Sequence, residues 1–379
     1  MSERKIKILL MIDDAAVGGG QQHVLSLARG LNKNIFKVAV ACESTGYLVD
    51  EVKKEDVSFF PISMSNSPSI SSFVRCIRVL NTFAPDILHT HGGTAGVYGR
   101  AASVLSRTPH TVHTYHGIHY LHFERKAVRF VYTSIDRLLL LVTDRIICVA
   151  QMDFDDGCRA GIVNPKKSHV ITNGIDVEYF HREALKASEE VTREKKGKEV
   201  VIGTIGRLHH QKGYEYFIEA AAIVLREYPN AIFHIVGDGS LRSSLERKCR
   251  ALGIDGRVRF RGARTDIPRE LAQMDVFVLA SLWEGFPIVL LEAMAAQKPI
   301  VASRANGVTE IVEDEKEALL VESRDPGAIA RSVLRLIRDP SLKHILTERA
   351  LEKVRERFDV KQMVSRTENV YKELSESYL

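Results

Sequence analysis

Short apolar runs alternate with longer amphipathic stretches along most of the chain. The runs have the length of buried strands, and the stretches between them repeat apolar residues with the period of a helix. Strands of a parallel sheet are buried on both faces, so this alternation predicts parallel sheets covered by helices on both sides. The first series of predicted strands covers Ile6–Ile12, Phe36–Ala41, Val57–Phe60, Ile87–His89, Thr111–His113, Arg145–Val149 and His169–Ile171.

The alternation weakens from Asn173 to Lys198, where a turn signal and a charged run predict a solvated connector. A second series of strands follows, and three helices end the chain. These strands cover Val200–Ile205, Ala231–Val236, Val258–Phe260, Val276–Leu279, Pro299–Val301 and Leu319–Val321, and the helices cover Pro326–Arg338, Ser341–Arg357 and Val360–Leu379. The predicted fold class is α/β, with two doubly wound domains over residues 1–175 and 176–358 facing across a cleft, and a terminal helix over 359–379.

The composition fits two hydrophobic cores of ordinary size. Of the 379 residues, 45% are hydrophobic, and no collagen, coiled-coil or low-complexity pattern occurs. The formal net charge of +5 suits an anionic ligand or an anionic membrane surface, and we predict no nucleic-acid partner.

The cysteine pattern and the apolar stretches indicate a cytoplasmic location. Five cysteines are scattered along predicted strands and helices without a C-x-x-C pair, which favours reduced thiols. The stretch Met1–Asp14 is predicted to be a first strand rather than a signal peptide, and the longest apolar stretch, Leu138–Val142, is too short to span a bilayer.

Two glutamates flank a predicted helix start in the second domain. The strand Val276–Leu279 leads into a turn at Gly285 and then a helix predicted over Pro287–Ala296. The free N–H groups at such a helix start attract an anion, whereas carboxylates such as Glu284 and Glu292 accept hydrogen bonds from hydroxyl groups. The combination predicts a nucleotide-sugar site; the alternative is an amphipathic helix with two solvated glutamates.

The E-x7-E spacing of Glu284 and Glu292 resembles the motif of the family 4 retaining glycosyltransferases of the GT-B fold. The resemblance implies that Glu284 touches the donor sugar, as a catalytic residue, and that Glu292 holds the ribose hydroxyls. It also implies that Phe286, Pro287 and Ile288 line the donor. In such enzymes the first domain binds the acceptor, the second binds the nucleotide sugar, and the last helix crosses back onto the first domain.

A second turn, Gly206–Gly213, carries two cations. Arg207 and Lys212 lie on either side of the turn and can grip a diphosphate, the arginine with its fork and the lysine as a point charge. The chain has no P-loop pattern. A lone Arg/Lys pair is commonly an exposed surface pair that binds no ligand. The Gly-Arg and Lys-Gly pairs in this order match the resembled family. Because two cations can neutralise the leaving diphosphate, we predict no metal and no cofactor.

Further glycine-containing turns follow other predicted strands. His23 stands where the dinucleotide fingerprint requires glycine, which disfavours a nicotinamide enzyme. The resembled family has an acidic residue after the first glycines, where this chain has Gln21 and Gln22. The donor-binding residues that the resemblance implies in these turns are Gly19, Gly20, Gly237, Arg261 and Gly262.

The first domain contains a group of histidines, which suggests either a metal site or separate roles. Threonine, valine and tyrosine among them favour a strand and loop, on which successive histidines would diverge, and no Cys or acidic cluster accompanies them. We therefore predict no metal there. The group comprises His89, His91, His110, His113, His116, His119 and His122.

The resemblance gives two of these histidines a role. Thr114-Tyr115-His116 followed by Gly117 matches the family's active-site histidine, which contacts the donor sugar. His91 and Gly117 are predicted to lie on the acceptor side. The stretch ending in His91 is most similar to enzymes that build bacterial surface polysaccharides; one of the two histidines could instead be a satisfied structural residue.

The predicted function is a retaining, metal-independent glycosyltransferase. It would move a sugar from a nucleotide sugar, a UDP-sugar by default, to a glycan or polyprenyl-linked acceptor in surface polysaccharide assembly. Two alternatives stay open: a GT-B nucleotide-sugar 2-epimerase and a non-catalytic sugar-binding protein.

The segment Tyr120–Tyr132 suggests a peripheral position at the inner face of the membrane. Its aromatic and cationic residues resemble an interfacial helix, on which Phe123, Lys126 and Phe130 would share one face. A helix predicted over Ser72–Thr82 could join the same surface. The alternative is an ordinary amphipathic helix packed on the sheet.

Overall fold

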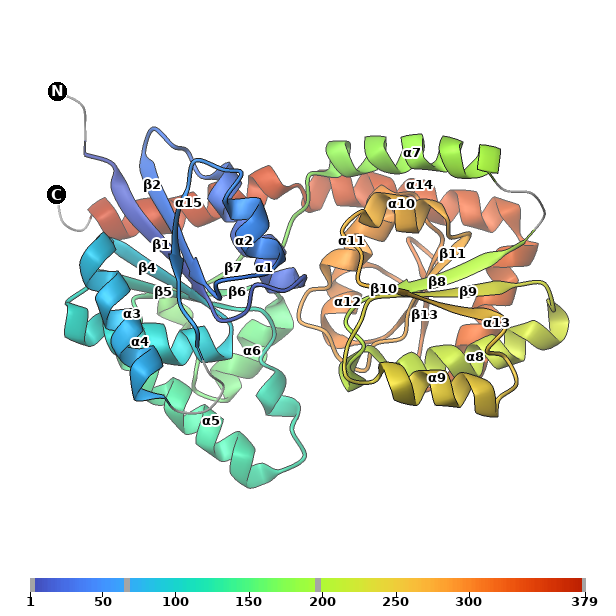
Figure 1. Ribbon diagram of the computed structural model, residues 1–379, viewed down its shortest axis with the longest axis horizontal. Helices are drawn as coiled ribbons and strands as arrows, with labels where there is room; N and C mark the ends of the chain where they lie inside the picture. The colour runs from blue at the N-terminus through green and yellow to red at the C-terminus, as the bar shows by residue number, and fades with distance from the viewer. Residues whose placement is uncertain (1–3, 65–68, 195–198, 377–379) are drawn as a thin grey trace. The chain divides into compact units, whose positions relative to one another are not determined.

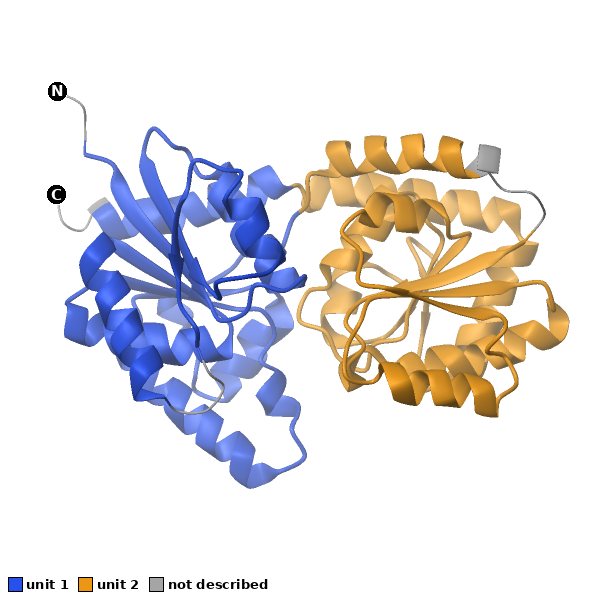
Figure 2. Cartoon of the chain, in the orientation of Figure 1, with its two compact units in different colours: residues 1–174, 360–379 blue, residues 175–359 orange. Residues whose placement is uncertain are grey.

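The computed structural model describes residues 4–64, 69–194 and 199–376. The chain divides into two compact units (Figure 2). Unit 1 contains residues 1–174 and 360–379, and unit 2 contains residues 175–359. Each division lies one residue from the boundary predicted above.

Unit 1 is built on a parallel sheet with the strand order β3-β2-β1-β4-β5-β6-β7. Every neighbouring pair in this order is parallel. The strands are β1 (Ile6–Ile12), β2 (Phe36–Cys42), β3 (Ser58–Pro61), β4 (Ile87–His91), β5 (His110–Tyr115), β6 (Arg145–Cys148) and β7 (Ser168–Val170). The order reverses between β1 and β4, as in a doubly wound sheet.

Helices cover both faces of this sheet (Figure 1). Successive residues of β1 alternate between two cores, because side chains along a strand point to opposite faces. Ile8 and Leu10 pack in the core with α1, α2 and α15. Leu9 and Met11 pack in the core with α3 and α4. The helices are α1 (Gly19–Gly30), α2 (Tyr47–Val52), α3 (Ile70–Phe83), α4 (Gly93–Ser106), α5 (Lys126–Leu139), α6 (Gln151–Arg159) and α15 (Val360–Glu376), with 3-10 turns η1 (His119–His122), η2 (Leu140–Val142) and η3 (Pro165–Lys167).

The last helix, α15, belongs to unit 1 although it follows unit 2 in the sequence. Tyr371 is fully buried, and its hydroxyl lies 2.5 Å from Nδ1 of His89 on β4. Val364 packs against Gly30 at the end of α1. These contacts fix α15 against β4 and α1 of unit 1.

Unit 2 repeats the arrangement with the strand order β10-β9-β8-β11-β12-β13, again parallel and reversing at its centre. The strands are β8 (Val201–Ile205), β9 (Ile232–Val236), β10 (Val258–Gly262), β11 (Val276–Leu279), β12 (Ile300–Ser303) and β13 (Leu319–Val321). The helices are α7 (Val177–Glu194), α8 (Tyr214–Glu227), α9 (Arg242–Ala251), α10 (Ile267–Ala272), α11 (Ile288–Ala295), α12 (Asn306–Ile311), α13 (Pro326–Arg338) and α14 (Pro340–Arg357), with the 3-10 turn η4 (His210–Lys212).

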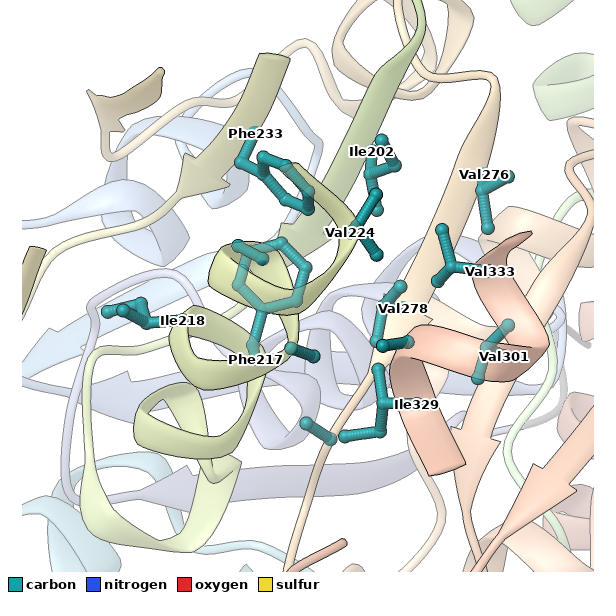
Figure 3. Close-up of a cluster of buried hydrophobic side chains, with 14 of the residues drawn as sticks. Ile202, Phe217, Ile218, Val224, Phe233, Val276, Val278, Val301, Ile329 and Val333 are labelled. Carbon is teal, nitrogen blue, oxygen red and sulfur yellow. The ribbon is translucent and has the colours of Figure 1, made fainter. Parts of the chain in front are cut away.

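One core of unit 2 lies between the sheet and the helices α8 and α13 (Figure 3). Phe217 of α8 meets Phe233 of β9 edge to face, with 5.8 Å between the ring centroids. Val278 of β11 and Val333 of α13 extend the same core. The apolar runs that predicted strands are therefore those buried under helices.

The connector predicted between the two strand series was wrong, because most of it is the helix α7. Its buried side chains recur with helical period and pack against α10 and α11; they are Val177, Phe180, Ala184, Ala187 and Val191. The acids Glu189 and Glu190 occupy the exposed side of the helix. The lysines of the charged run at positions 195, 196 and 198 lie outside the described residues.

Candidate active site

The predicted site residues follow the carboxyl ends of central strands in both sheets. In unit 1, Gly19, Gly20 and His91 come after β1 and at the end of β4, the two strands between which the order reverses. In unit 2, Lys212 and Glu284 follow β8 and β11, which hold the equivalent positions. Ligands of doubly wound folds bind at such switch points, so each unit has its candidate residues where its topology predicts a ligand.

Glu284 is held by a lysine and a serine. The Lys212 ammonium donates to Glu284 Oε1 over 2.5 Å, and the Ser281 hydroxyl donates to the same oxygen over 2.6 Å. The Gln211 amide donates to the other oxygen over 3.4 Å and to the Trp283 carbonyl over 3.0 Å. The side chain of Glu284 is 6% exposed, and the Lys212 ammonium compensates the charge of this buried carboxylate.

Glu292 lies in a different environment eight positions later. Its side chain is 8% exposed and has no hydrogen-bond or ion-pair partner among the described residues. Burial raises the pKa of this carboxyl group from 4.5 to about 7. The two glutamates of the predicted motif therefore differ: one is engaged, and the other offers a free carboxyl group.

Close backbone approaches hold the turns of unit 2 together. A side chain on Gly213 would place its Cβ 2.1 Å from the Ala280 carbonyl oxygen, and one on Gly237 would place it 1.9 Å from that of Gly206. Both glycines also have positive φ, of 61° and 132°. The Gly237 N–H donates to the Gly262 carbonyl over 2.8 Å, so three predicted glycine turns meet at one edge of the sheet.

The two predicted arginines differ in their partners. The Arg207 side chain is exposed and has no partner among the described residues, which leaves its guanidinium available for an anion. Arg261 makes a bidentate pair with Glu270, with donor–acceptor distances of 3.0 and 3.1 Å. Arg261 is therefore already neutralised by a carboxylate on α10.

The residues before α11 are buried supports of the Glu284 turn. Phe286 is 5% exposed and packs edge to face on Phe358, with 5.5 Å between the ring centroids. Pro287 is the N-cap of α11, one position outside the helix predicted to begin there, and Ile288 is its first residue. The Gly307 N–H donates to the Glu284 carbonyl over 3.3 Å and secures the turn from α12.

Three histidines meet at the carboxyl end of the unit 1 sheet. They are His23 on α1, His91 at the end of β4 and His116 just after β5. Nδ1 of His91 and Nε2 of His116 lie 3.2 Å apart, and His23 Nδ1 lies 2.8 Å from Oδ1 of Asn173. His91 and His116 come from neighbouring strands, so their meeting lies outside the expectation that successive histidines of one strand and loop diverge.

Two other histidines of unit 1, His89 and His113, have their own partners. His89 lies between the hydroxyls of Tyr371 and Thr114, at 2.5 and 2.7 Å, and His113 lies 2.9 Å from the hydroxyl of Thr90. Burial lowers the pKa of both imidazoles well below the usual value, which keeps them neutral. They are structural residues beneath the candidate site.

One of the predicted glycines, Gly20, lies beside the His116 ring. A Cβ added to Gly20 would lie 3.6 Å from Cδ2 of His116, which is an ordinary van der Waals contact. Gly19 is the first residue of α1, and Gly117 has a φ of 113° with the His119 ring beside it. The turn that contains Gly20 and the loop that contains His116 and Gly117 are therefore neighbours, although they were predicted separately.

Sequence reasoning missed several of the supporting residues. Ser281 and Gln211, which bind Glu284, carry no signal beyond their place in the two turns. Asn173 could have been suspected from its position in a turn after a strand, but its partner His23 lies 150 positions away. Such pairs are visible only once the sheet order is known.

Two family models match the chain. The model described as glycosyl transferases group 1 covers residues 186–353, and the model described as glycosyltransferase family 4 covers residues 17–179. UDP-Gal:alpha-D-GlcNAc-diphosphoundecaprenol alpha-1,3-galactosyltransferase of Escherichia coli is 30% identical over 375 residues, with 97% of each chain covered.

Solved structures share the fold along the whole chain. Anabaena Alr3699/HepE in complex with UDP-glucose matches with a TM-score of 0.82 and 22% identity, over 98% of this chain and 100% of that one. Sucrose-phosphate synthase from Thermosynechococcus elongatus matches with a TM-score of 0.82 and 18% identity over the same shares. The predicted fold class is confirmed, and the near-full-length match at 30% identity shows that the chain is an enzyme of the glycosyltransferase family 4, with the GT-B fold.

Proposed function

We propose that the protein transfers a sugar from a UDP-sugar to a lipid-linked glycan during surface polysaccharide assembly, with retention of the anomeric configuration and without a metal ion. The E. coli relative, whose name specifies UDP-galactose and a diphosphoundecaprenol-linked acceptor, supports the donor and acceptor classes. The family 4 membership supports transfer over epimerisation or sugar binding alone.

The observation that carries the proposal is the Lys212–Glu284 pair. An ammonium group has three N–H donors, and the 2.5 Å bond to Glu284 uses one of them. The others are available to a diphosphate oxygen, while the second carboxylate oxygen of Glu284 can accept a sugar hydroxyl. One ion pair thus connects a diphosphate subsite with a sugar subsite.

Glu292 supplies the ribose subsite. Its buried, unpartnered carboxyl group suits two neighbouring hydroxyls, whose hydrogen bonds would favour its ionised form. Binding of UDP should therefore lower the pKa of Glu292 and release a proton near neutral pH.

The proposed mechanism needs no metal because Arg207 and Lys212 neutralise the leaving diphosphate. Glu284, bonded to Lys212 and Ser281, holds the sugar rather than attacking it. The reaction then proceeds on the front face: the acceptor oxygen bonds to the anomeric carbon as the bond to the UDP oxygen breaks, and the donor phosphate takes the acceptor proton.

The acceptor would be presented by an anionic membrane surface that contacts α5. This helix turns Thr133 and Asp136 inward and apolar side chains outward. The outward residues are Phe130, Val131 and Leu138 of α5 and Leu141 of the following turn η2, which are 69%, 53%, 67% and 77% exposed. An exposed apolar face flanked by cations such as Lys126 fits the interface of an anionic bilayer.

The predicted membrane face needs one correction. Phe123 does not share a helix with Lys126 and Phe130, because it is the C-cap of the 3-10 turn η1 and α5 begins only at Lys126. Among the described residues, no helix has both the length and the apolar character to cross a bilayer. Contact with the membrane would therefore rest on the outward face of α5.

The decisive experiment is a transfer assay with UDP-galactose and GlcNAc-diphosphoundecaprenol in excess chelator. We expect a disaccharide lipid and UDP as products, and no activity in Glu284→Ala. No product with any UDP-sugar, or an epimerised nucleotide sugar without acceptor, would refute the proposal. A strict requirement for a divalent ion would refute only metal independence.

Vesicle flotation tests the membrane surface. The protein should float with anionic vesicles, less with neutral ones, and less in high salt. Phe130→Ser combined with Leu138→Ser should abolish flotation, whereas Leu185→Ser, at an exposed leucine of α7, should not. Equal flotation of the two variants would exclude α5 as the contact.

A further inference from the structure

The ring nitrogens of His23, His91 and His116 form an unusual buried cluster. One ring nitrogen of each residue lies within 4.8 Å of one from each of the other two. β4 lies between β1 and β5 in the sheet, and each histidine sits at or just beyond the carboxyl end of this three-strand group. The cluster is therefore fixed by the centre of the fold and not by a surface loop.

Each histidine has a nitrogen without a hydrogen-bond partner. The Asn173 oxygen can only accept, so Nδ1 of His23 carries the proton and its Nε2 presents a lone pair. Nε2 of His23 is buried and has no hydrogen-bond partner, and Nδ1 of His91 and Nε2 of His116 face each other. The outer nitrogens of these two rings, Nε2 of His91 and Nδ1 of His116, are also buried and unpaired, so the cluster lacks the full hydrogen bonding that buried polar atoms normally have.

We propose that His23, His91 and His116 bind one divalent transition-metal ion of the zinc class. Three imidazoles with an open fourth position suit Zn²⁺, Co²⁺ or Ni²⁺, whereas Mg²⁺ and Ca²⁺ require oxygen ligands. The hydrogen bond from His23 to Asn173 is the kind of outer contact that orients a metal-bound imidazole.

The distances are compatible with a tetrahedral ion after a small movement. Zn–N bonds of about 2.05 Å place two ligand nitrogens roughly 3.4 Å apart. The facing nitrogens of His91 and His116, at 3.2 Å, already meet this separation. The widest separation, up to 4.8 Å, must close by about 1.4 Å, which a ring rotation can supply. His116 is partly exposed, so an ion has a route of entry.

The ion would inhibit rather than assist transfer. This consequence rests on the proposed function together with the contact between His116 and the donor sugar that the family resemblance implies. An imidazole that is bound to a metal cannot also accept or donate a hydrogen bond to the sugar with the same nitrogen. Metal binding and sugar binding through the same nitrogen of His116 are therefore mutually exclusive.

Cobalt titration of the untagged, chelator-treated full chain tests the site directly. Four-coordinate Co²⁺ gives intense visible absorption, and we expect one ion per chain, displaced by Zn²⁺ but not by Mg²⁺. His23→Ala and His91→Ala should each weaken binding at least tenfold, while His122→Ala, at an exposed histidine of the same unit, should bind as the wild type. Retained affinity in His23→Ala, or no wild-type absorption band, would overturn the proposal.

Two further measurements separate the site from folding defects and from the proposed function. Asn173→Ala keeps all three ligands and should weaken Zn²⁺ binding by about 10- to 100-fold in calorimetry. Zn²⁺ should raise the wild-type melting temperature and leave that of His23→Ala unchanged. No donor or acceptor is present in these assays, so a failed transfer assay leaves the site intact, and absent metal binding leaves the transferase proposal intact.

Discussion

Replacing Glu292 by glutamine should stabilise unit 2 at alkaline pH and leave it nearly unchanged at pH 4.5. Burial raises the pKa of Glu292 from 4.5 to about 7, and this side chain has no partner within the described structure. The folded protein thus holds the proton more tightly than the unfolded chain. The stability associated with this group is full below pH 4.5 and is lost as the pH rises through about 7.

The magnitude follows from the two pKa values. Each pKa unit corresponds to about 1.4 kcal/mol, so ionised Glu292 lowers the free energy of unfolding by about 3 kcal/mol at pH 8. Glutamine has nearly the same shape and cannot ionise, so the variant should avoid that loss. At pH 4.5 the difference between the two proteins should fall below about 0.5 kcal/mol.

Urea unfolding followed by tryptophan fluorescence measures this difference in the free energy of unfolding of unit 2. Trp283 is the only tryptophan in the sequence, and it lies beside Glu284 in unit 2. Glu352→Gln is the matched control, because Glu352 is an exposed carboxylate of α14 in the same unit. The control should differ from the wild type by less than about 0.5 kcal/mol at both pH values. A Glu292→Gln effect that is the same at pH 4.5 and pH 8 would refute the reasoning.

Three further predictions concern the charged pairs. Arg207→Ala and Lys212→Ala should each weaken UDP binding by about 1.5–3 kcal/mol in calorimetry, and unchanged affinity in both would discard the diphosphate assignment. Glu284→Gln should lower turnover more than UDP affinity, because its proposed partners are sugar hydroxyls; the opposite pattern in steady-state kinetics and calorimetry would reassign it. Arg100→Met should lower the free energy of unfolding of unit 1 by about 3–5 kcal/mol, because Asp136 stays buried without the cation that lies 2.6 Å away. Urea unfolding followed by circular dichroism measures this loss. A loss below about 1 kcal/mol would contradict a buried ion pair there.

The sequence by itself determined the strands and the class of fold. A parallel strand covered by helices on both sides needs apolar residues on both faces, so β1, β8 and β11 are readable as apolar runs. The spacing of Glu284 and Glu292 around a glycine turn was likewise local information. Resemblance to a family then supplied roles that the spacing alone did not contain.

Helix α7 shows where composition misled the prediction. The exposed side of the helix is rich in charged residues, which led to the prediction of a solvated connector. The apolar residues of the same segment nevertheless recur at helical intervals. The helix is stabilised by burying Phe180 and Val191 against unit 2, in contact with α10 and α11. Those contacts come from distant parts of the chain, so only the tertiary structure decided between helix and connector.

The chemistry of the site also depended on tertiary structure. His23, His91 and His116 meet because β1, β4 and β5 are neighbours in the sheet, and strand order is not written in local sequence. Glu284 and Glu292 are the same residue type, yet Lys212 compensates the charge of Glu284, whereas burial raises the pKa of Glu292 to about 7. Ionisation depends on the desolvation and charge that surround a group, and both are set by how the chain packs.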